Sequence, residues 1–181
     1  MTLGAHSLVT TRAAMPRDAA LLATLAATTF SDSFAADNTP EDMALYMAGA
    51  FGESIQHAEL SDPRNIVFLA EQNGEAVGYA MLHQGPAPDV VSGVDPIEIA
   101  RLYATKRWIG AGIGAALMQR CLDEAAARDQ RTIWLGVWEH NARAIAFYRR
   151  WGFVDIGAQP FMLGRDMQTD RVMARRVAEE R

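Results

Sequence analysis

A cluster of glycines between an apolar stretch and an amphipathic stretch is the first feature with chemical meaning. Its sequence is Gly110-Ala111-Gly112-Ile113-Gly114-Ala115. In a loop that joins a strand to a helix, successive backbone N–H groups can converge on one point, with the positive end of the helix dipole behind them. Glycine lets a ligand's oxygens approach the main chain closely. The cluster therefore predicts a phosphate-binding loop, and a glycine turn that only packs a helix against a strand is the alternative.

Two other phosphate-binding motifs compare less well with this segment. A P-loop would need Gly-Lys followed by Ser or Thr, and the sequence lacks this run here. A dinucleotide-binding fingerprint is formally met if Ala115 replaces its last glycine and Glu139 acts as its acidic residue. That fingerprint usually opens a doubly wound sheet, and too little chain follows to build the rest. A dinucleotide-binding domain is the less favoured alternative.

The segments around the loop predict the elements that position it. Ile97–Ala104 is apolar and β-branched enough for a strand, and a helix follows the loop to about Arg128. A further strand over Thr132–Trp138 leads into a helix over residues 141–151, which Gly152 ends. The loop should thus lie in a strand-helix-strand-helix unit.

The first half of the chain predicts a strand, two helices and a hairpin. Residues 8–12 contain a β-branched run, Val9-Thr10-Thr11, that predicts a strand, and a helix begins near Pro16. This helix includes an apolar run that superficially resembles a signal peptide, but its leucines recur at helical spacing. Thr39 should cap a second helix, before a break at residues 61–63. Two apolar runs then flank Asn73-Gly74, a pair typical of tight hairpin turns.

Composition bounds the class of protein. The chain has 181 residues, half of them hydrophobic, which predicts one globular domain over residues 1–181. Its net charge of -5 argues against a nucleic-acid partner, and no apolar run approaches the ~20 residues of a membrane span. One cysteine, Cys121, excludes an internal disulfide and favours a reducing, cytoplasmic setting, with Cys121 itself facing the core. The four histidines show no ligand spacing, so no metal is expected.

Three segments together resemble the GCN-related N-acetyltransferase (GNAT) superfamily. Leu102-Tyr103-Ala104 resembles the end of the family's central strand, and the glycine cluster resembles its pyrophosphate loop. Asn141-Ala142-Arg143-Ala144-Ile145-Ala146-Phe147-Tyr148-Arg149-Arg150-Trp151-Gly152-Phe153 resembles its closing helix and turn. The resemblance implies a mixed α/β fold with a mostly antiparallel sheet, a splayed parallel pair of strands and flanking helices. It also implies direct acetyl transfer from acetyl-CoA to an amine acceptor, and paired subunits, which are common in the family, make a homodimer an expectation.

The resemblance also implies which residues hold the cofactor and carry the reaction. The expected contacts to acetyl-CoA are Leu102, Tyr103, Ala104, Ile109, Gly110, Ala111, Gly112, Ile113, Gly114, Ala115, Asn141 and Tyr148. Ile109 stands where the family usually has Arg or Gln, so cofactor affinity can differ, and Lys106 and Arg107 either replace that charge or are solvated surface cations. Tyr148 should protonate the leaving thiolate, with core packing as its alternative role.

An amine with the pKa of lysine, ~10.4, is neutral in about one molecule in two thousand at pH 7, a penalty of roughly 4.6 kcal/mol. A base must therefore take its proton. Glu98 lies where some members of the family place one, although its pKa suits the task only if burial raises it or water relays the proton. The alternative is a carboxylate that pairs with Arg101 or solvent. A noncatalytic sensor of acyl-CoA is the alternative function.

The acceptor is the least specified part of the reaction. Residues 161–173 and 134–139 are similar to the PaiA-type spermidine/spermine N-acetyltransferases, which implies a polyamine, with protein amines or antibiotics as alternatives. The acceptor cleft should lie between the first two helices and the central strands. The residues expected to line it are Phe30, Asp32, Phe34 and Asp37.

Overall fold

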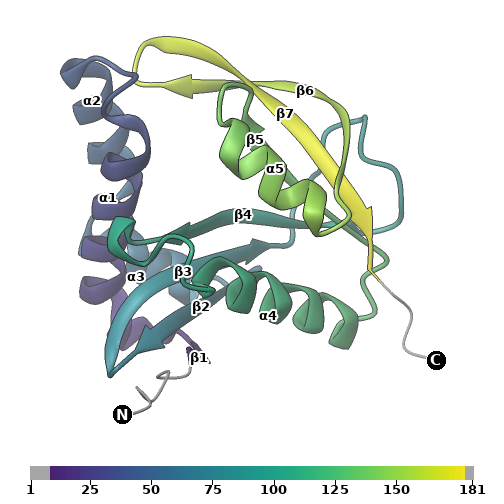
Figure 1. Cartoon of the computed structure of the whole chain (residues 1–181), viewed down its shortest axis with the longest axis horizontal. Helices are drawn as coiled ribbons and strands as arrows, with labels where there is room; N and C mark the ends of the chain where they lie inside the picture. Colours follow the sequence, from purple (N-terminus) through teal and green to yellow (C-terminus); the bar gives the residue numbers. More distant parts are fainter. Residues whose placement is uncertain (1–8, 178–181) are drawn as a thin grey trace, which may run out of the picture.

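The computed structural model describes residues 9–177, in which one mixed sheet is flanked by helices (Figure 1). Its seven strands follow the order β1-β2-β3-β4-β5-β7-β6. Every neighbouring pair is antiparallel except β4 and β5, which run parallel. The expected mixed α/β fold is thus confirmed. The strands are β1 (Thr10–Ala13), β2 (Asn65–Gln72), β3 (Glu75–His83), β4 (Ile97–Ala104), β5 (Thr132–Trp138), β6 (Val154–Leu163) and β7 (Asp166–Arg176).

The helices cover both faces of the sheet. One face buries the apolar sides of α4 and α5, and the other buries α1, with α3 packed beside it (Figure 1). Cys121 lies in the α4 core and is fully buried, as expected. No helix within residues 9–177 is long and apolar enough to cross a bilayer. The helices are α1 (Ala19–Phe34), α2 (Pro40–Ala50), α3 (Glu53–Ser61), α4 (Ile113–Ala127) and α5 (Ala142–Arg150), with short 3-10 turns at Pro16–Asp18 and Lys106–Trp108.

The parallel strands β4 and β5 stay together for only two residues each. Ile97 pairs with Ile133, and Glu98 pairs with Trp134. Beyond these pairs the strands separate, and β5 continues against β7 while β4 continues against β3. The edge of β4 that faces β5 therefore has no partner strand within the described part of the chain from Ile99 onward, and a gap opens in the sheet.

A hairpin turn, a helix start and a helix end form where the residue types predict them. Asn73 and Gly74 both have positive φ, 53° and 78°, and join β2 to β3 in the expected hairpin. Thr39 caps α2 through its side chain, which accepts a hydrogen bond from the Asp42 N–H. Gly152 ends α5 with a φ of 82°.

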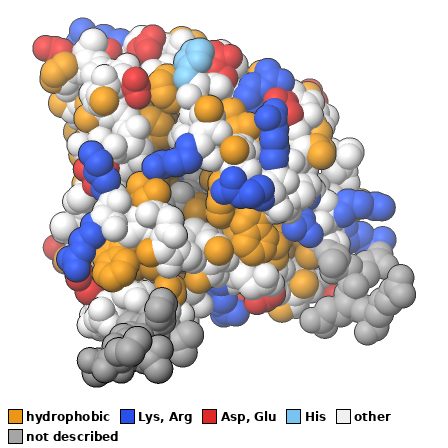
Figure 2. All heavy atoms as spheres, in the orientation of Figure 1, with side chains coloured by type: hydrophobic (Ala, Val, Ile, Leu, Met, Phe, Trp, Pro, Cys, Tyr) orange, Lys and Arg blue, Asp and Glu red, His pale blue; other side chains and the backbone are white. Residues whose placement is uncertain are grey.

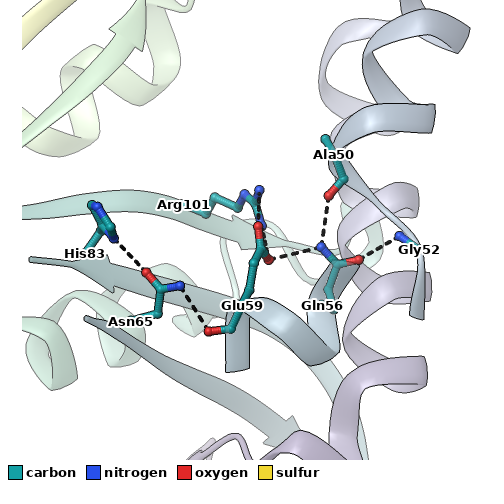
Figure 3. Close-up of polar contacts among 7 residues, drawn as sticks. All are labelled: Ala50, Gly52, Gln56, Glu59, Asn65, His83 and Arg101. Atoms are coloured by element: carbon teal, nitrogen blue, oxygen red, sulfur yellow. Dashed lines mark hydrogen bonds and ion pairs between the residues drawn. The ribbon is translucent and has the colours of Figure 1, made fainter. Parts of the chain in front are cut away.

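The helical region before residue 61 forms two helices rather than the one expected. The chain breaks at Phe51 and Gly52, where α2 ends and α3 begins. The fully buried Gln56 makes this break stable (Figure 3). Its Oε1 accepts a hydrogen bond from the Gly52 N–H at 2.7 Å, and its Nε2 donates to the Ala50 carbonyl at 2.9 Å. A side chain thereby replaces the backbone partners that a continuous helix would supply.

A second set of polar contacts fastens α3 to the centre of the sheet (Figure 3). The two terminal guanidinium nitrogens of Arg101 on β4 donate to the carboxylate of Glu59, at 2.8 and 2.9 Å. Asn65 donates to the Glu59 carbonyl and contacts His83 Nδ1 through its own Oδ1. Arg101 therefore pairs with Glu59 and not with Glu98, the partner considered from the sequence.

The chain after α5 forms a long hairpin that the sequence analysis did not predict. β6 and β7 pair along their whole length, and β7 inserts between β6 and β5. Gly164 turns the hairpin at a φ of 63°. This turn packs on the start of α2, where the Arg165 N–H donates to Asp42 Oδ1 at 2.7 Å.

Candidate active site

A cavity of about 480 Å³ lies where β4 and β5 separate. Its walls include residues 99–104 of β4 and residues 136–138 of β5, the two edges of the gap. Phe30 and Phe34 line it from α1, and Phe147 and Tyr148 line it from α5 on the other face of the sheet. The cavity therefore passes through the sheet, so that two molecules entering from opposite faces would meet at the gap.

The glycine loop forms the end of the cavity at the start of α4. Gly110 and Gly112 have φ values of 84° and 87°, which favour glycine, and a Cβ added to either would meet no atom within 4 Å. Gly112 is the N-cap of α4 without any side-chain cap in the described residues. The N–H groups of residues 113–115 have no partner within the helix. Open backbone donors at a helix N-terminus fit an anionic phosphate, the ligand expected at this loop.

Most of the residues expected to contact a cofactor do line this cavity. The exceptions are Ala111, which is exposed and donates its N–H to the Trp108 carbonyl, and Ile113, which is buried in the core. The expected residues that line the cavity are Leu102, Tyr103, Ala104, Ile109, Gly110, Gly112, Gly114, Ala115, Asn141 and Tyr148.

Two arginines of α5 bring positive charge to the cavity in addition to Arg101, which is paired with Glu59. Arg143 and Arg150 line it, and Lys and Arg side chains gather around a hydrophobic area on this face of the molecule (Figure 2). Lys106 and Arg107 are exposed and do not line the cavity, and Arg107 lies over the Trp108 ring at 5.2 Å. The charge that the loop lacks at Ile109 is thus available from a helix that the sequence analysis had not considered for it. No group of three potential metal ligands occurs within residues 9–177.

Tyr148 and Asn141 are placed by α5. The Tyr148 ring is buried, packs edge-on against Phe147 and Phe153, and lines the cavity. Burial raises the pKa of Tyr148 above its usual value, so the phenol keeps its proton at neutral pH. Asn141 caps α5 by accepting a hydrogen bond from the Ala144 N–H at 3.1 Å, and it also lines the cavity. A capping role and a ligand contact are thus compatible for Asn141.

Glu98 lies apart from these residues. It occupies the closed end of the gap, where β4 still pairs with β5, and it is absent from the cavity wall. Its neighbours Ile97 and Ile99 point into the α4 core, so the alternation along the strand turns the Glu98 side chain to the other face. Burial raises the pKa of Glu98. The structure therefore does not bring this carboxylate together with Tyr148 in the cavity.

Only two of the four residues expected to line the acceptor cleft line the cavity. Phe30 and Phe34, one turn apart on α1, line the cavity, whereas Asp32 and Asp37 are exposed and do not. Helical spacing explains the division for Asp32, because residues i and i+4 share a face and i+2 does not.

Sequence reasoning missed most of the acceptor side of the cavity. Asp170 on β7 lines it, and burial raises the pKa of this carboxyl to about 6. Further lining residues come from α2, the loop before α3, β5, β6 and β7. They are Tyr46, Phe51, Trp138, Phe161 and Gln168. Residues 134–139 and 161–173 carried a signal as segments, through their family resemblance, but no individual side chain in them was distinguished.

Comparison with known proteins agrees with this geometry. The model of the acetyltransferase (GNAT) family matches residues 27–153. An uncharacterized N-acetyltransferase of Mycobacterium bovis is 36% identical over 158 residues, which cover 87% of this chain and 97% of that protein.

Two solved structures have the same fold. The PaiA N-acetyltransferase of Thermoplasma acidophilum, in complex with coenzyme A, has a TM-score of 0.75 at 16% identity, over 93% of this chain and 99% of that one. An acetyltransferase of Salmonella typhimurium with its cofactor acetyl-CoA has a TM-score of 0.72 at 20% identity, over 97% of both chains. The chain belongs to the acetyltransferase (GNAT) family, whose co-substrate is acetyl-CoA.

Proposed function

We propose that this chain transfers the acetyl group of acetyl-CoA to a primary amine of a small molecule while both are bound. The observation that carries this proposal is the cavity through the sheet, with open backbone donors of α4 at one end and aromatic side chains of α1 and α2 at the other. Such a site orients two reactants toward one point, which supports direct attack rather than a covalent enzyme intermediate.

The residues of the loop and of α5 suit the cofactor's phosphates. The N–H groups of Gly112 to Ala115 and the charges of Arg143 and Arg150 would hold them. When bound, acetyl-CoA supplies a thioester whose carbonyl carbon accepts the amine's lone pair and whose sulfur departs with the bonding electrons. The unpartnered edge of β4 near Leu102 to Ala104 offers backbone N–H groups to the carbonyl oxygen, where negative charge develops.

Tyr148 is proposed to act on the departing sulfur. Its hydroxyl makes no hydrogen bond to other described residues, so it remains available to a ligand in the cavity. The phenol stays protonated because burial raises its pKa. It can therefore donate a hydrogen bond to the sulfur as charge develops there and pass on its proton. The attacking nitrogen loses its second proton to solvent as the amide forms, and solvent restores the proton of Tyr148.

Polyamines are the first acceptors to test. The choice of polyamines follows from the similarity of residues 134–139 and 161–173 to the PaiA-type enzymes, and the net charge of -5 agrees with a cationic acceptor. Peptide amines and aminoglycoside antibiotics are the alternatives. We also propose that the protein is cytoplasmic and forms a homodimer. Size-exclusion chromatography with light scattering measures the oligomeric state.

The test is a thiol-release assay with acetyl-CoA against spermidine, spermine, lysine peptides and aminoglycosides. Turnover of one of these amines above the hydrolysis background is the expected result. If the protein binds acetyl-CoA but no amine releases thiol, the noncatalytic sensor is the correct function. Turnover of an amine other than a polyamine would change the acceptor class and keep the reaction.

Replacing Gly112 with alanine is expected to weaken acetyl-CoA binding at least tenfold without unfolding the protein. The added methyl group meets no protein atom within 4 Å, but it occupies the space through which phosphates approach the N–H groups. Isothermal titration calorimetry measures the Kd. Gly74→Ala is the matched control, because Gly74 also has a positive φ of 78° and open space around it, yet lies in a distant hairpin. Equal Kd values for the two variants would contradict the assignment of the loop.

A further inference from the structure

A series of aromatic rings surrounds the acceptor end of the cavity. Trp138 of β5 contacts Phe34 of α1 with ring centroids 6.2 Å apart, and Phe34 contacts Phe30 at 4.6 Å. Phe30 stacks on Tyr46 of α2 at 4.5 Å, and Tyr46 contacts Phe161 of β6 at 5.5 Å. All of these rings line the cavity. The series, here called the aromatic wall, therefore runs from β5 around to β6 by way of two helices.

Asp170 lies on β7, between the two strands that carry the ends of the aromatic wall. β7 lies between β5 and β6, and Asp170 is paired in register with Trp138 on one side and with Gln159 on the other. Gln159 shares a strand face with Phe161, two residues further along β6. The Asp170 carboxylate thus lies on the same side of the sheet as both ends of the wall.

A glycine gives this carboxylate its position. A Cβ on Gly136 of β5 would lie 3.1 Å from Asp170 Oδ2 and 2.7 Å from Gln159 Nε2, so the close approach of both polar groups depends on the missing side chain. Asp170 forms no ion pair or hydrogen bond through its side chain within residues 9–177. A half-buried carboxylate that lacks a protein partner is suited to a cationic ligand.

We propose that Asp170 and the aromatic wall bind the reactive ammonium of the acceptor, carried on an arm that is otherwise uncharged. Aromatic faces attract an ammonium through their quadrupoles, and the carboxylate supplies the opposite charge. This inference rests on the proposed acetyl transfer but changes the favoured acceptor, because one ammonium on an uncharged arm describes a monoamine and not a polyamine.

The charges of the cavity argue for one ammonium rather than two. Asp170 is the only acidic residue among the described residues that line the cavity. Arg101 also lines it, with its guanidinium 5.4 Å from the Phe51 ring and already paired with Glu59. A second ammonium inside the cavity would find no carboxylate and would be repelled by Arg101, whereas an apolar arm would pack on the rings.

Asp170 can also remove the proton that blocks the amine. One N–H bond of the ammonium breaks, its electron pair stays on nitrogen, and the proton moves to Asp170 and from there to solvent after each turnover. The pKa of about 6 makes Asp170 a better base than an ordinary aspartate, because the gap to the pKa of the amine is smaller. Below pH 6 the carboxyl is protonated and can neither attract nor deprotonate the ammonium, so activity falls as the pH is lowered through this value.

The groups that face Asp170 across the cavity are few. Among the described residues of the cavity wall, the titratable side chains on the acceptor side are Tyr46 from α2 and Arg101 and Tyr103 from β4. The pKa of Tyr46 is raised, chiefly by burial, with Arg101 lowering it and Asp170 raising it to smaller extents. Burial also raises the pKa of Tyr103. All three side chains keep their protons near pH 6, so the expected change at this pH belongs to Asp170.

The first experiment compares butylamine with 1,4-diaminobutane as acceptors, since they differ mainly in a second ammonium held inside the cavity. We expect kcat/KM to be at least tenfold higher for butylamine. An equal or higher value for the diamine, or for spermidine, would overturn the single-ammonium site. If no amine of the earlier panel and neither of these is acetylated, the proposed function itself fails, which is a different result.

The second experiment uses Asp170→Asn, with Asp129→Asn at an exposed turn as the matched control. We expect Asp170→Asn to weaken butylamine binding to the coenzyme A complex at least tenfold by calorimetry and to remove the acidic limb near pH 6 from the kcat/KM profile. The Kd for acetyl-CoA should stay unchanged, which shows that the variant is folded. Unchanged amine affinity and an unchanged pH profile in this variant would refute the proposal, even if the wild type acetylates amines well.

Discussion

Replacing Tyr148 with phenylalanine is expected to lower kcat by about 100-fold, a loss of about 2.7 kcal/mol of transition-state stabilisation. The ring lines the cavity from α5, and its hydroxyl is the group that we propose interacts with the departing sulfur. Packing should be retained, since the hydroxyl has no hydrogen bond to other described residues whose loss would strand a partner. Steady-state thiol release measures kcat, and calorimetry measures the Kd for acetyl-CoA, which should change less than threefold.

Tyr79→Phe is the control for this experiment. Tyr79 is also a fully buried tyrosine, but it lies in the α1 core and does not line the cavity. Its variant should keep kcat within about twofold of the wild type. If Tyr148→Phe keeps full turnover as well, Tyr148 has no part in the chemistry and serves only to pack α5.

Replacing Gly164 with alanine is expected to lower the free energy of unfolding by about 3 kcal/mol. Gly164 has a φ of 63°, and a Cβ there would lie 2.5 Å from the Asp42 Cα and 2.6 Å from its carbonyl oxygen. These are backbone atoms at the start of α2, so the overlap cannot be relieved by the rotation of a neighbouring side chain. Thermal unfolding should show a melting temperature lower by roughly 6–12 °C.

Gly74→Ala again separates the two causes of this loss. It has nearly the same φ, 78°, but nothing lies within 4 Å of its Cβ, so it measures the conformational strain alone, about 1 kcal/mol. The excess loss in Gly164→Ala then measures the contact between the β6–β7 turn and α2. Equal losses in both variants would show that this contact is not tight. Because α2 carries Tyr46, we also expect a raised KM for the amine in Gly164→Ala with the Kd for acetyl-CoA unchanged.

The elements around the glycine loop could be predicted because their signals are local. The apolar run at Ile97–Ala104, the helical spacing after Gly112 and the Asn73-Gly74 pair, whose residue types accept a positive φ, all act within a few residues. The break between α2 and α3 has a local signal in Gly52, a residue type that disfavours helix, but the hydrogen bonds that hold the break come from a buried glutamine several residues downstream. A fully buried polar side chain has its effect only once the fold surrounds it.

The acceptor side could not be predicted from sequence for a related reason. Asp170 becomes a cavity residue only because β7 inserts between β5 and β6, a pairing between segments that do not follow each other in the chain. The choice of Asp32 neglected a signal that was present, since Phe30 and Phe34 on one face of α1 place it on the other. For Glu98, the sequence predicts the strand on which the residue lies, but it does not predict where along that strand the sheet opens.

The burial of Cys121 has a practical consequence for work on this protein. This side chain is fully buried in α4, and its surroundings raise the pKa of the thiol to about 12, so almost none of it is thiolate at neutral pH. It is also the chain's one cysteine. Maleimide dyes should therefore leave the native protein unlabelled, and a cysteine introduced at Val94, which is 82% exposed, would carry a single fluorophore at a known place.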